Sequence, residues 1–349
     1  MYITKKPNLG IRYVNLRVHA RIADLLTMEQ MQELAEAPGV DGFLEKLEDT
    51  PYGTVTFVDT ERPDIYLERV FYQKFIERIE KIVEITPKKI GEFLMSYYQM
   101  RFEVVNLKRI LRGKFSNASN DEINASLIPI HPYMAGDFEA LISAESLEKV
   151  IEMLQGTPYA AVNDQMDIYK EYDALWPLEL WLNHKNASMI LDTVENLPKK
   201  NRNIVIKLVK LETDIENVLI AIKQRGRETS VEELREMFPA TYGIALSQLE
   251  EIIEVENIRP VIQALGTPYA EILGPIYEGD VALIRTYLRL AKYEHAKTSR
   301  STDEFGFNVI MAYLVYSEIE KDNLVGIAWG KAQGLPSTEL LNYVVIPRG

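Results

Sequence analysis

A tripeptide, Thr-Pro-Tyr, occurs three times at nearly even spacing, and the rest of the chain can be aligned on it. Its prolines are Pro51, Pro158 and Pro268, which lie 107 and 110 residues apart. Proline cannot continue a helix, and the tyrosine that follows can pack back onto the helix that has just ended. Each copy is therefore expected to form a turn after a short helix.

Two further markers repeat in the same register. An asparagine stands 55 to 59 residues after each of these prolines, three positions after an acidic residue and directly before an aliphatic one. These asparagines are Asn106, Asn217 and Asn323. A second proline follows each asparagine by 22 to 24 residues, at Pro129, Pro239 and Pro347. Three markers in register three times indicate an internal triplication.

The expected units comprise residues 1–129, 130–239 and 240–349, and each is long enough to bury a core. Apolar residues recur at helical spacing almost throughout, so the predicted fold class is all-α. Short helices are expected at 13–36, 40–47, 143–154 and 246–265, the last with a break at Pro260. Long ones, forming a helical hairpin in each unit, are expected at 62–85, 90–111, 160–197, 201–223, 281–296 and 307–329, with an interruption of 160–197 at Pro177. One apolar run of strand length, Tyr343 to Ile346, stands near the end.

Composition narrows the classes of function. Of the 349 residues, 47% are hydrophobic and 26% charged, which is typical of a soluble globular protein. The absence of cysteine excludes disulfides and thiolate chemistry. A net charge of −13 argues against a general nucleic-acid or anionic-membrane surface, because both require positive charge. No apolar run is long enough to span a membrane, and the N-terminus has no signal-peptide core.

Little in the sequence points to catalysis. Residues 326–332 resemble a phosphate-binding loop, but the glycine spacing is one residue short and Ala332 replaces the residue that would hold Mg²⁺. Gly113 and Lys114 occupy the equivalent place in the first unit, which favours a helix end capped by glycine. The histidines lack the spacing of metal ligands. They are His19, His131, His184 and His295. No cofactor or metal is therefore expected.

The three repeated asparagines are more informative. Each stands inside an apolar helical pattern, where a polar residue is unfavourable unless it finds a hydrogen-bond partner. We predict that all three are buried and bonded to backbone at the junction between neighbouring units. A shared ligand site is the alternative. A structural rule repeated three times, without reactive residues repeated three times, is typical of a scaffold.

Three segments of the chain carry a family resemblance: Tyr13 to Arg21, Phe102 to Lys114 and Glu318 to Lys331. Together they resemble the C subunit of archaeal and bacterial A/V-type ATP synthases. The d subunit of eukaryotic vacuolar ATPases is a more distant relative, whose characteristic N-terminal sequence is absent here. The resemblance covers nearly the whole chain, and the triplication and length agree with it.

The resemblance implies a fold and a role. The fold would be a funnel of three similar helical units with pseudo-three-fold symmetry. Its place would be the central stalk of a proton- or sodium-translocating complex, on the cytoplasmic side of the membrane and peripheral to it. There it would cap the proteolipid ring and hold the axle subunits, so that torque passes between them. The family has no catalytic motif, and neither an enzyme nor a nucleotide-binding or nucleic-acid-binding role is implied.

Two other classes of function stay open. A non-rotary helical scaffold could bind a partner helix or peptide in a concave face, although solenoid repeats of about 20 to 45 residues are shorter than these units. An enzyme would need convergent polar residues that the sequence does not display. An adaptor should co-purify with axle and ring subunits, whereas a peptide scaffold should not.

Basic residues near the ends of the hairpins are the candidates for contact with a partner. They are Lys108, Arg109, Arg112, Lys114, Arg225, Arg227 and Lys331. Positive charge at a helix C-terminus is also favourable through the helix dipole, by about 0.3–1 kcal/mol, so simple capping is the alternative. If these ends line one rim of the funnel, they would meet acidic or carbonyl-rich surface on a partner subunit.

Overall fold

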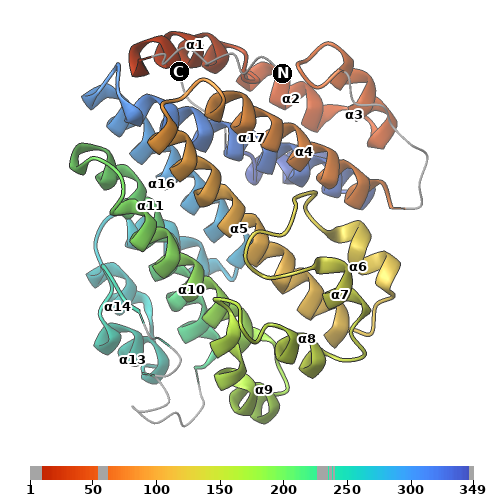
Figure 1. Ribbon diagram of the computed structural model, residues 1–349, viewed down its shortest axis with the longest axis vertical. Coiled ribbons are helices and arrows are strands. Elements are labelled where there is room, and N and C mark those ends of the chain that lie inside the picture. The colour runs from red at the N-terminus through yellow and green to blue at the C-terminus, as the bar shows by residue number, and fades with distance from the viewer. Residues whose placement is uncertain (1–9, 54–61, 226–234, 236–237, 239, 346–349) are drawn as a thin grey trace, which may run out of the picture. The chain divides into compact units, whose positions relative to one another are not determined.

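The protein is helical throughout its described residues, which are 10–53, 62–225, 235, 238 and 240–345 of the computed structural model (Figure 1). No strand occurs among them, and this confirms the all-α prediction. The strand-length run at Tyr343 continues helix α18 as a turn and then as irregular backbone up to Val345, and Ile346 lies outside these residues.

The helices follow the predicted pattern of short segments and long hairpins. In the first half of the chain they are α1 (Ile11–Ala23), α2 (Met28–Glu36), α3 (Gly39–Glu48), α4 (Pro63–Val83), α5 (Lys88–Phe115), α6 (Asn120–Ser126), α7 (Phe138–Ser143), α8 (Leu147–Met153) and a 3₁₀ turn, η1 (Ala160–Gln165). In the second half they are α9 (Met166–Tyr172), α10 (Trp176–Val194), α11 (Lys199–Lys223), α13 (Leu246–Glu254), α14 (Arg259–Ala264), α15 (Tyr269–Leu273), η2 (Gly274–Glu278), α16 (Val281–Thr302), α17 (Phe307–Ala332) and α18 (Ser337–Asn342).

Capping residues and prolines set several helix boundaries that apolar spacing alone does not show. The segment 13–36 is two helices, because Thr27 and Gln30 form a capping box that starts α2. Ser146 caps α8, whereas Ser143 ends α7 and does not begin a helix. Pro177 and Pro260 each stand in the first turn of a helix, where proline is tolerated, so they begin α10 and α14.

Two compact units make up the described chain. One comprises the described residues up to Ser96, Asn196–Ile204 and those from Arg289 onward, and the other comprises Tyr97–Glu195 and Val205–Leu288. The first contains α17, which is apolar on nearly all sides and packs against α1, α3 and α4. The core of the second includes residues of α5, α7, α8 and α10. The division into units 1–129, 130–239 and 240–349 stays a prediction.

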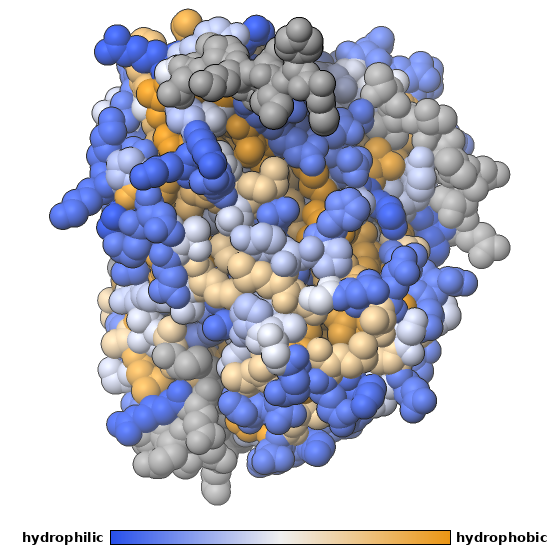
Figure 2. All heavy atoms as spheres, viewed as in Figure 1, coloured by the Kyte–Doolittle hydropathy of each residue, from blue (hydrophilic) through white to orange (hydrophobic). Residues whose placement is uncertain are grey.

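The surface carries charged and apolar side chains together. On the face drawn in Figure 2, hydrophilic side chains project at many places and hydrophobic ones are visible between them. Among the described residues, none of the helices combines the length and apolar composition that crossing a membrane requires.

Candidate functional site

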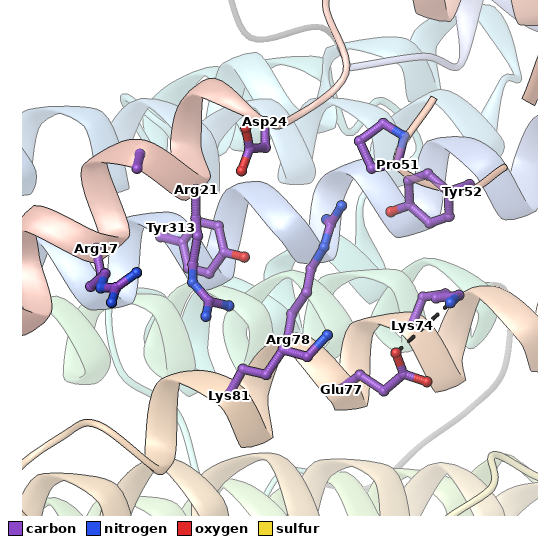
Figure 3. Close-up of a pocket in the computed structure, with 11 residues that line it drawn as sticks. Arg17, Arg21, Asp24, Pro51, Tyr52, Lys74, Glu77, Arg78, Lys81 and Tyr313 are labelled. Carbon is purple, nitrogen blue, oxygen red and sulfur yellow. Dashed lines mark ion pairs between the residues drawn. The ribbon is translucent and has the colours of Figure 1, made fainter. Parts of the chain in front are cut away.

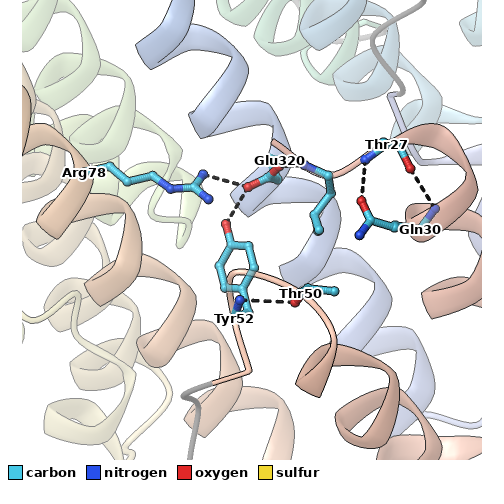
Figure 4. A network of polar contacts seen from close by, with 7 residues as sticks. Thr27, Gln30, Thr50, Tyr52, Arg78 and Glu320 are labelled. Atoms are coloured by element: carbon cyan, nitrogen blue, oxygen red, sulfur yellow. Dashed lines mark hydrogen bonds and ion pairs between the residues drawn. The ribbon is translucent and has the colours of Figure 1, made fainter. Parts of the chain in front are cut away.

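A buried carboxylate on α17 holds three other segments of the first unit. Glu320 is 4% exposed and accepts a hydrogen bond from the Tyr52 hydroxyl at 2.7 Å. Arg78 Nη1 on α4 donates to the same carboxylate oxygen at 2.6 Å, and the backbone N–H of Leu26 donates to the other oxygen at 2.5 Å (Figure 4). The Thr-Pro-Tyr turn is thereby fixed to the middle of the C-terminal long helix.

The second Thr-Pro-Tyr turn binds an equivalent acid on α5. Glu103 is fully buried and accepts a hydrogen bond from the Tyr159 hydroxyl at 2.9 Å. Three successive backbone N–H groups donate to its other oxygen at 2.6–3.0 Å. They belong to Tyr133, Met134 and Ala135. A buried carboxylate is costly unless its oxygens are hydrogen-bonded, and this one has four donors.

The third turn repeats the arrangement with a shorter acid on α11. Asp214 is fully buried and accepts from the Tyr269 hydroxyl at 2.7 Å and from the N–H groups of Tyr242 and Gly243 at 2.9 and 2.7 Å. Glycine is needed at 243, because a Cβ there would lie 2.1 Å from the Tyr269 hydroxyl oxygen. The backbone N–H of Gly243 and the Tyr269 hydroxyl thus lie side by side, and both donate to the same oxygen of Asp214.

The threonines of the first two turns have the same role. The hydroxyl of Thr50 donates to Leu47 O at 2.6 Å and accepts from Tyr52 N at 3.1 Å. Thr157 makes the same pair of bonds, to Leu154 O at 2.7 Å and from Tyr159 N at 3.1 Å. The third turn differs, since Thr267 Oγ1 donates to the Glu271 carboxylate at 3.3 Å. Hydrogen bonds therefore account for the tyrosine in all three turns and for the threonine in the first two.

The tyrosines are good donors because they hold their protons. Burial, and then the adjacent carboxylate, raises the pKa of Tyr52, Tyr159 and Tyr269 above the ordinary value. Burial also raises the pKa of the Asp214 carboxyl, although its hydrogen bonds act in the opposite direction. Each site is therefore a neutral phenol bonded to a carboxyl group inside the protein.

The predicted burial and backbone bonding of the three asparagines are confirmed, whereas their place at junctions between units stays a prediction. All are buried, and each bonds the backbone of a residue 22 or 23 positions later. Asn106 exchanges two bonds with Ile128, at 3.0 and 2.8 Å, and Asn323 exchanges two with Val345, at 2.7 and 3.0 Å. The side-chain amide thus replaces a backbone partner for the segment near the next proline.

Asn217 shows a variation on this bond. Its Nδ2 donates to Ala240 O at 2.9 Å, and its Oδ1 lies 2.7 Å from His184 Nε2. Since the amide oxygen can only accept, we assign the ring proton to Nε2. Burial lowers the pKa of His184, so the ring is neutral. This histidine is a structural hydrogen-bond partner of Asn217.

The pairing of acid with tyrosine was not foreseen. The acid three positions before the asparagine was recognised as part of a marker, but its partner was not. In the chain, Glu103 and Asp214 precede their tyrosines by 56 and 55 residues, whereas Glu320 follows Tyr52 by 268. The constant separation of the first two pairs was a usable signal. The third pair requires the last long helix, α17, to meet the first Thr-Pro-Tyr turn.

The basic residues predicted to contact a partner are held by groups of their own unit. Lys108 donates to Asn183 Oδ1 at 2.7 Å, and its burial lowers the pKa of its ammonium group. Arg109 donates to Ser126 O. Arg112 forms a two-bond ion pair with Glu179 at 2.5 and 2.9 Å, yet its side chain is 57% exposed.

The remaining members of that set also have internal partners where they are described. Lys114 and Lys331 each reach the residue six positions later, Asn120 at 3.1 Å and Ser337 at 3.5 Å. Lys114 also donates to Ile142 O. Arg225 donates to the carbonyls of Val255 and Glu256 at 2.8 and 2.6 Å. Arg227 lies outside the described residues.

The glycines near the hairpin ends are not helix caps, which corrects the sequence prediction. Gly113 and Gly330 stand within α5 and α17, two residues before each helix ends. A Cβ would lie 2.3 Å from Ile123 Cγ1 at Gly113 and 2.1 Å from Leu340 Cδ2 at Gly330. Each glycine lets a short helix, α6 or α18, approach closely. The stretch that resembles a phosphate loop is accordingly the end of a continuous helix.

These features define a class: an all-helical protein whose repeated polar sites serve to hold helices and turns together. The sequence profile of the ATP synthase (C/AC39) subunit family matches residues 14–343. The chain belongs to this family.

Relatives agree over most of their length. The C subunit of the A-type ATP synthase of Methanocaldococcus jannaschii is 25% identical over 95% of this chain and 86% of its own. That of Methanothermobacter thermautotrophicus is 26% identical over 93% of this chain and 85% of its own. That of Methanococcoides burtonii is 25% identical over 96% and 94%. The similarity extends through all three predicted units.

Proposed function

We propose that the chain is the central-stalk adaptor of a rotary ATP synthase or ATPase, with no catalysis of its own. It joins the proteolipid ring of the membrane sector to the rotating axle, as a peripheral subunit on the cytoplasmic side. Its three helical units form a funnel with pseudo-three-fold symmetry. The family match over residues 14–343 carries the proposal, because it includes nearly the whole chain.

The hydrogen-bond sites support a role in transmitting torque. A coupler must resist deformation, and closely packed helices transmit strain with little compliance. Glu320 alone ties α17 to α4, to the turn after α3 and to the segment between α1 and α2. Buried, fully bonded networks of this kind make a segment rigid and specify one arrangement.

The role can be tested by removing the subunit from the complex. Membranes from cells that lack this chain should retain ATP hydrolysis in the catalytic part but lose ATP-driven ion transport. Addition of the purified chain should restore transport. If the catalytic part still assembled without this chain but no longer hydrolysed ATP, the chain would take part in the chemistry. Transport at the normal rate without the chain would exclude coupling.

We also propose that the basic residues near the ends of the hairpins contact a partner subunit. Arg112 is the member that we select for the test, because its side chain is 57% exposed. Arg112→Glu should weaken binding to axle or ring subunits, most visibly at low salt, because exposed charges chiefly affect association and its salt dependence. Arg112→Gln should have a smaller effect. Binding can be measured by surface plasmon resonance with purified subunits.

Lys149→Glu is the matched control, since Lys149 is equally exposed and also paired with a glutamate. It lies on the short helix α8 and not on a long hairpin helix. If Arg112→Glu, Lys149→Glu and wild type bound equally well at low ionic strength, the proposal would be contradicted. Arg112 would then serve only its internal ion pair with Glu179.

A further inference from the structure

A strongly basic pocket of about 560 Å³ lies within the first compact unit. α1, α4, α17 and the first Thr-Pro-Tyr turn line it. Figure 3 shows Arg17 and Arg21 extending from α1, and Arg78 and Lys81 from α4, into the same space. Five basic side chains line the pocket against two acidic ones, Asp24 and Glu77. This excess is notable in a chain whose net charge is −13.

Only part of this positive charge is neutralised. Lys74 lies 3.9 Å from Glu77, and Arg78 pairs with Glu320 at 2.6 Å. Arg17 donates to the Tyr13 hydroxyl at 3.1 Å, which carries no charge. Among the residues that the structure describes, Arg17, Arg21 and Lys81 form no ion pair. Like charges gathered without counter-charges repel one another, so they favour an anion between them.

The two equivalent sites provide an internal comparison. Glu103 and Asp214 accept only tyrosine and backbone donors within the described chain. Neither carboxylate is bonded to an arginine there. Holding a Thr-Pro-Tyr turn to its helix therefore needs no cation. Arg78 and the charges beside it are a property of this one copy, and the repeated structural role does not account for them.

We propose that this pocket binds a phosphate-bearing small molecule. Arginine presents a planar fork of donors that matches phosphate oxygens two at a time. Several convergent cations suit an anion with more than one negative charge. The volume falls within the range of roughly 300–1,000 Å³ that is usual for small-molecule sites. Tyr52, Tyr313 and Pro51 supply an apolar wall for the uncharged part of the ligand. The site is independent of the stalk role and would stand without it.

Calorimetric titration of the full-length subunit with inorganic pyrophosphate tests the proposal. Wild type should bind with an affinity that falls as salt is raised. Arg21→Gln and Lys81→Gln should each weaken binding about tenfold, because each removes a charge-assisted bond to the ligand. Lys88→Gln is the matched control. Its side chain is 88% exposed and already paired with Glu92, and it should bind like wild type.

A second experiment distinguishes a lipid headgroup from a free phosphate compound. It measures how much of the subunit is retained by phosphatidylglycerol vesicles, with phosphatidylcholine vesicles as the reference. Pyrophosphate binding together with anionic-vesicle retention that Arg21→Gln abolishes identifies a lipid headgroup. Pyrophosphate binding without retention identifies a free compound. Either result supports the site. No pyrophosphate binding by wild type overturns it, and so does equal weakening by Lys88→Gln, which would indicate general attraction to polyanions.

Discussion

Tyr52, Tyr159 and Tyr269 each give their hydroxyl proton to a buried carboxyl group, at 2.7, 2.9 and 2.7 Å. The sequence predicted three equivalent turns and tyrosines packed onto the helices before them. It did not predict what the hydroxyls bond. Partners so far apart in sequence are set by tertiary packing, and no local rule of propensity or capping reports them.

Removal of one hydroxyl should be measurable. Tyr159→Phe takes one donor from fully buried Glu103 and should lower the free energy of unfolding by about 1–3 kcal/mol. Tyr52→Phe and Tyr269→Phe should do the same. Tyr287→Phe, at an exposed tyrosine, is the control and should change stability by less than about 0.5 kcal/mol. Urea unfolding measures all four, and three values as small as the control would show that the bonds add nothing.

The raised tyrosine pKa values predict a pH dependence. Unfolded tyrosines lose their protons near the ordinary pKa of 10.0, whereas burial raises the pKa of folded Tyr159 above it. The folded state then binds more protons, so this stability is complete below pH 10.0 and is lost as the pH rises further. The stability advantage of wild type over Tyr159→Phe should shrink above pH 10.0 in urea unfolding. An advantage that grows there would contradict the assignment.

At the scale of helices, apolar spacing predicted the long elements well, including α4, α11 and α17. It failed where a few side chains decide a boundary. Thr27 and Gln30 start a new helix inside a periodic pattern, and Pro177 begins a helix that it was expected to interrupt. The role of Gly113 was missed because a close approach depends on the neighbouring helix, which one sequence pattern does not reveal.

Alanine substitutions at three glycines can distinguish the effect of close packing on stability from the effect of helix propensity. Gly113→Ala should destabilise the protein by about 1–3 kcal/mol, since its Cβ would meet Ile123 near its branch point. Gly330→Ala should cost less, because the terminal Leu340 methyl that it meets can move. Gly326→Ala is the control on the same helix. Beyond its chain neighbours and the nearby backbone of its own helix, no atom lies within 4 Å of a Cβ there, and alanine should stabilise by up to about 1 kcal/mol.

Thermal melts of the three variants check this order. Gly113→Ala should melt below wild type, and Gly326→Ala should melt at or above it. If Gly113→Ala and Gly326→Ala changed the melting temperature alike, the close approach of α6 to α5 would have no energetic consequence.

The asparagine bonds fix the segments that follow the long helices. Asn106→Leu would leave the N–H of Ile128 without a partner and should cost about 1–3 kcal/mol, whereas the carbonyl of Ile128 would keep its bond from the Ile130 N–H. Asn323→Leu should cost a similar amount through Val345. Asn217→Leu also strands His184. Asn342→Leu, at an exposed position, is the control. Melts in which the three buried replacements behave like Asn342→Leu would deny the bonds a role in stability.

At the scale of the whole molecule, the family resemblance is confirmed by the match to residues 14–343, and the division into three repeated units stays a prediction. The sequence could not reveal which tyrosine pairs with the third acid, Glu320. Glu320, near the end of the chain, takes its tyrosine from the first turn. The regular spacing of the repeats gives no signal for this pair, because its two residues lie near opposite ends of the chain.

Cross-linking mass spectrometry of the native membrane complex tests the central claim most directly. If the chain is the central-stalk adaptor, lysines on its surface should form cross-links to both an axle subunit and the proteolipid ring within the same preparation. Cross-links to peripheral subunits alone, or to neither the axle nor the ring, would contradict the adaptor role.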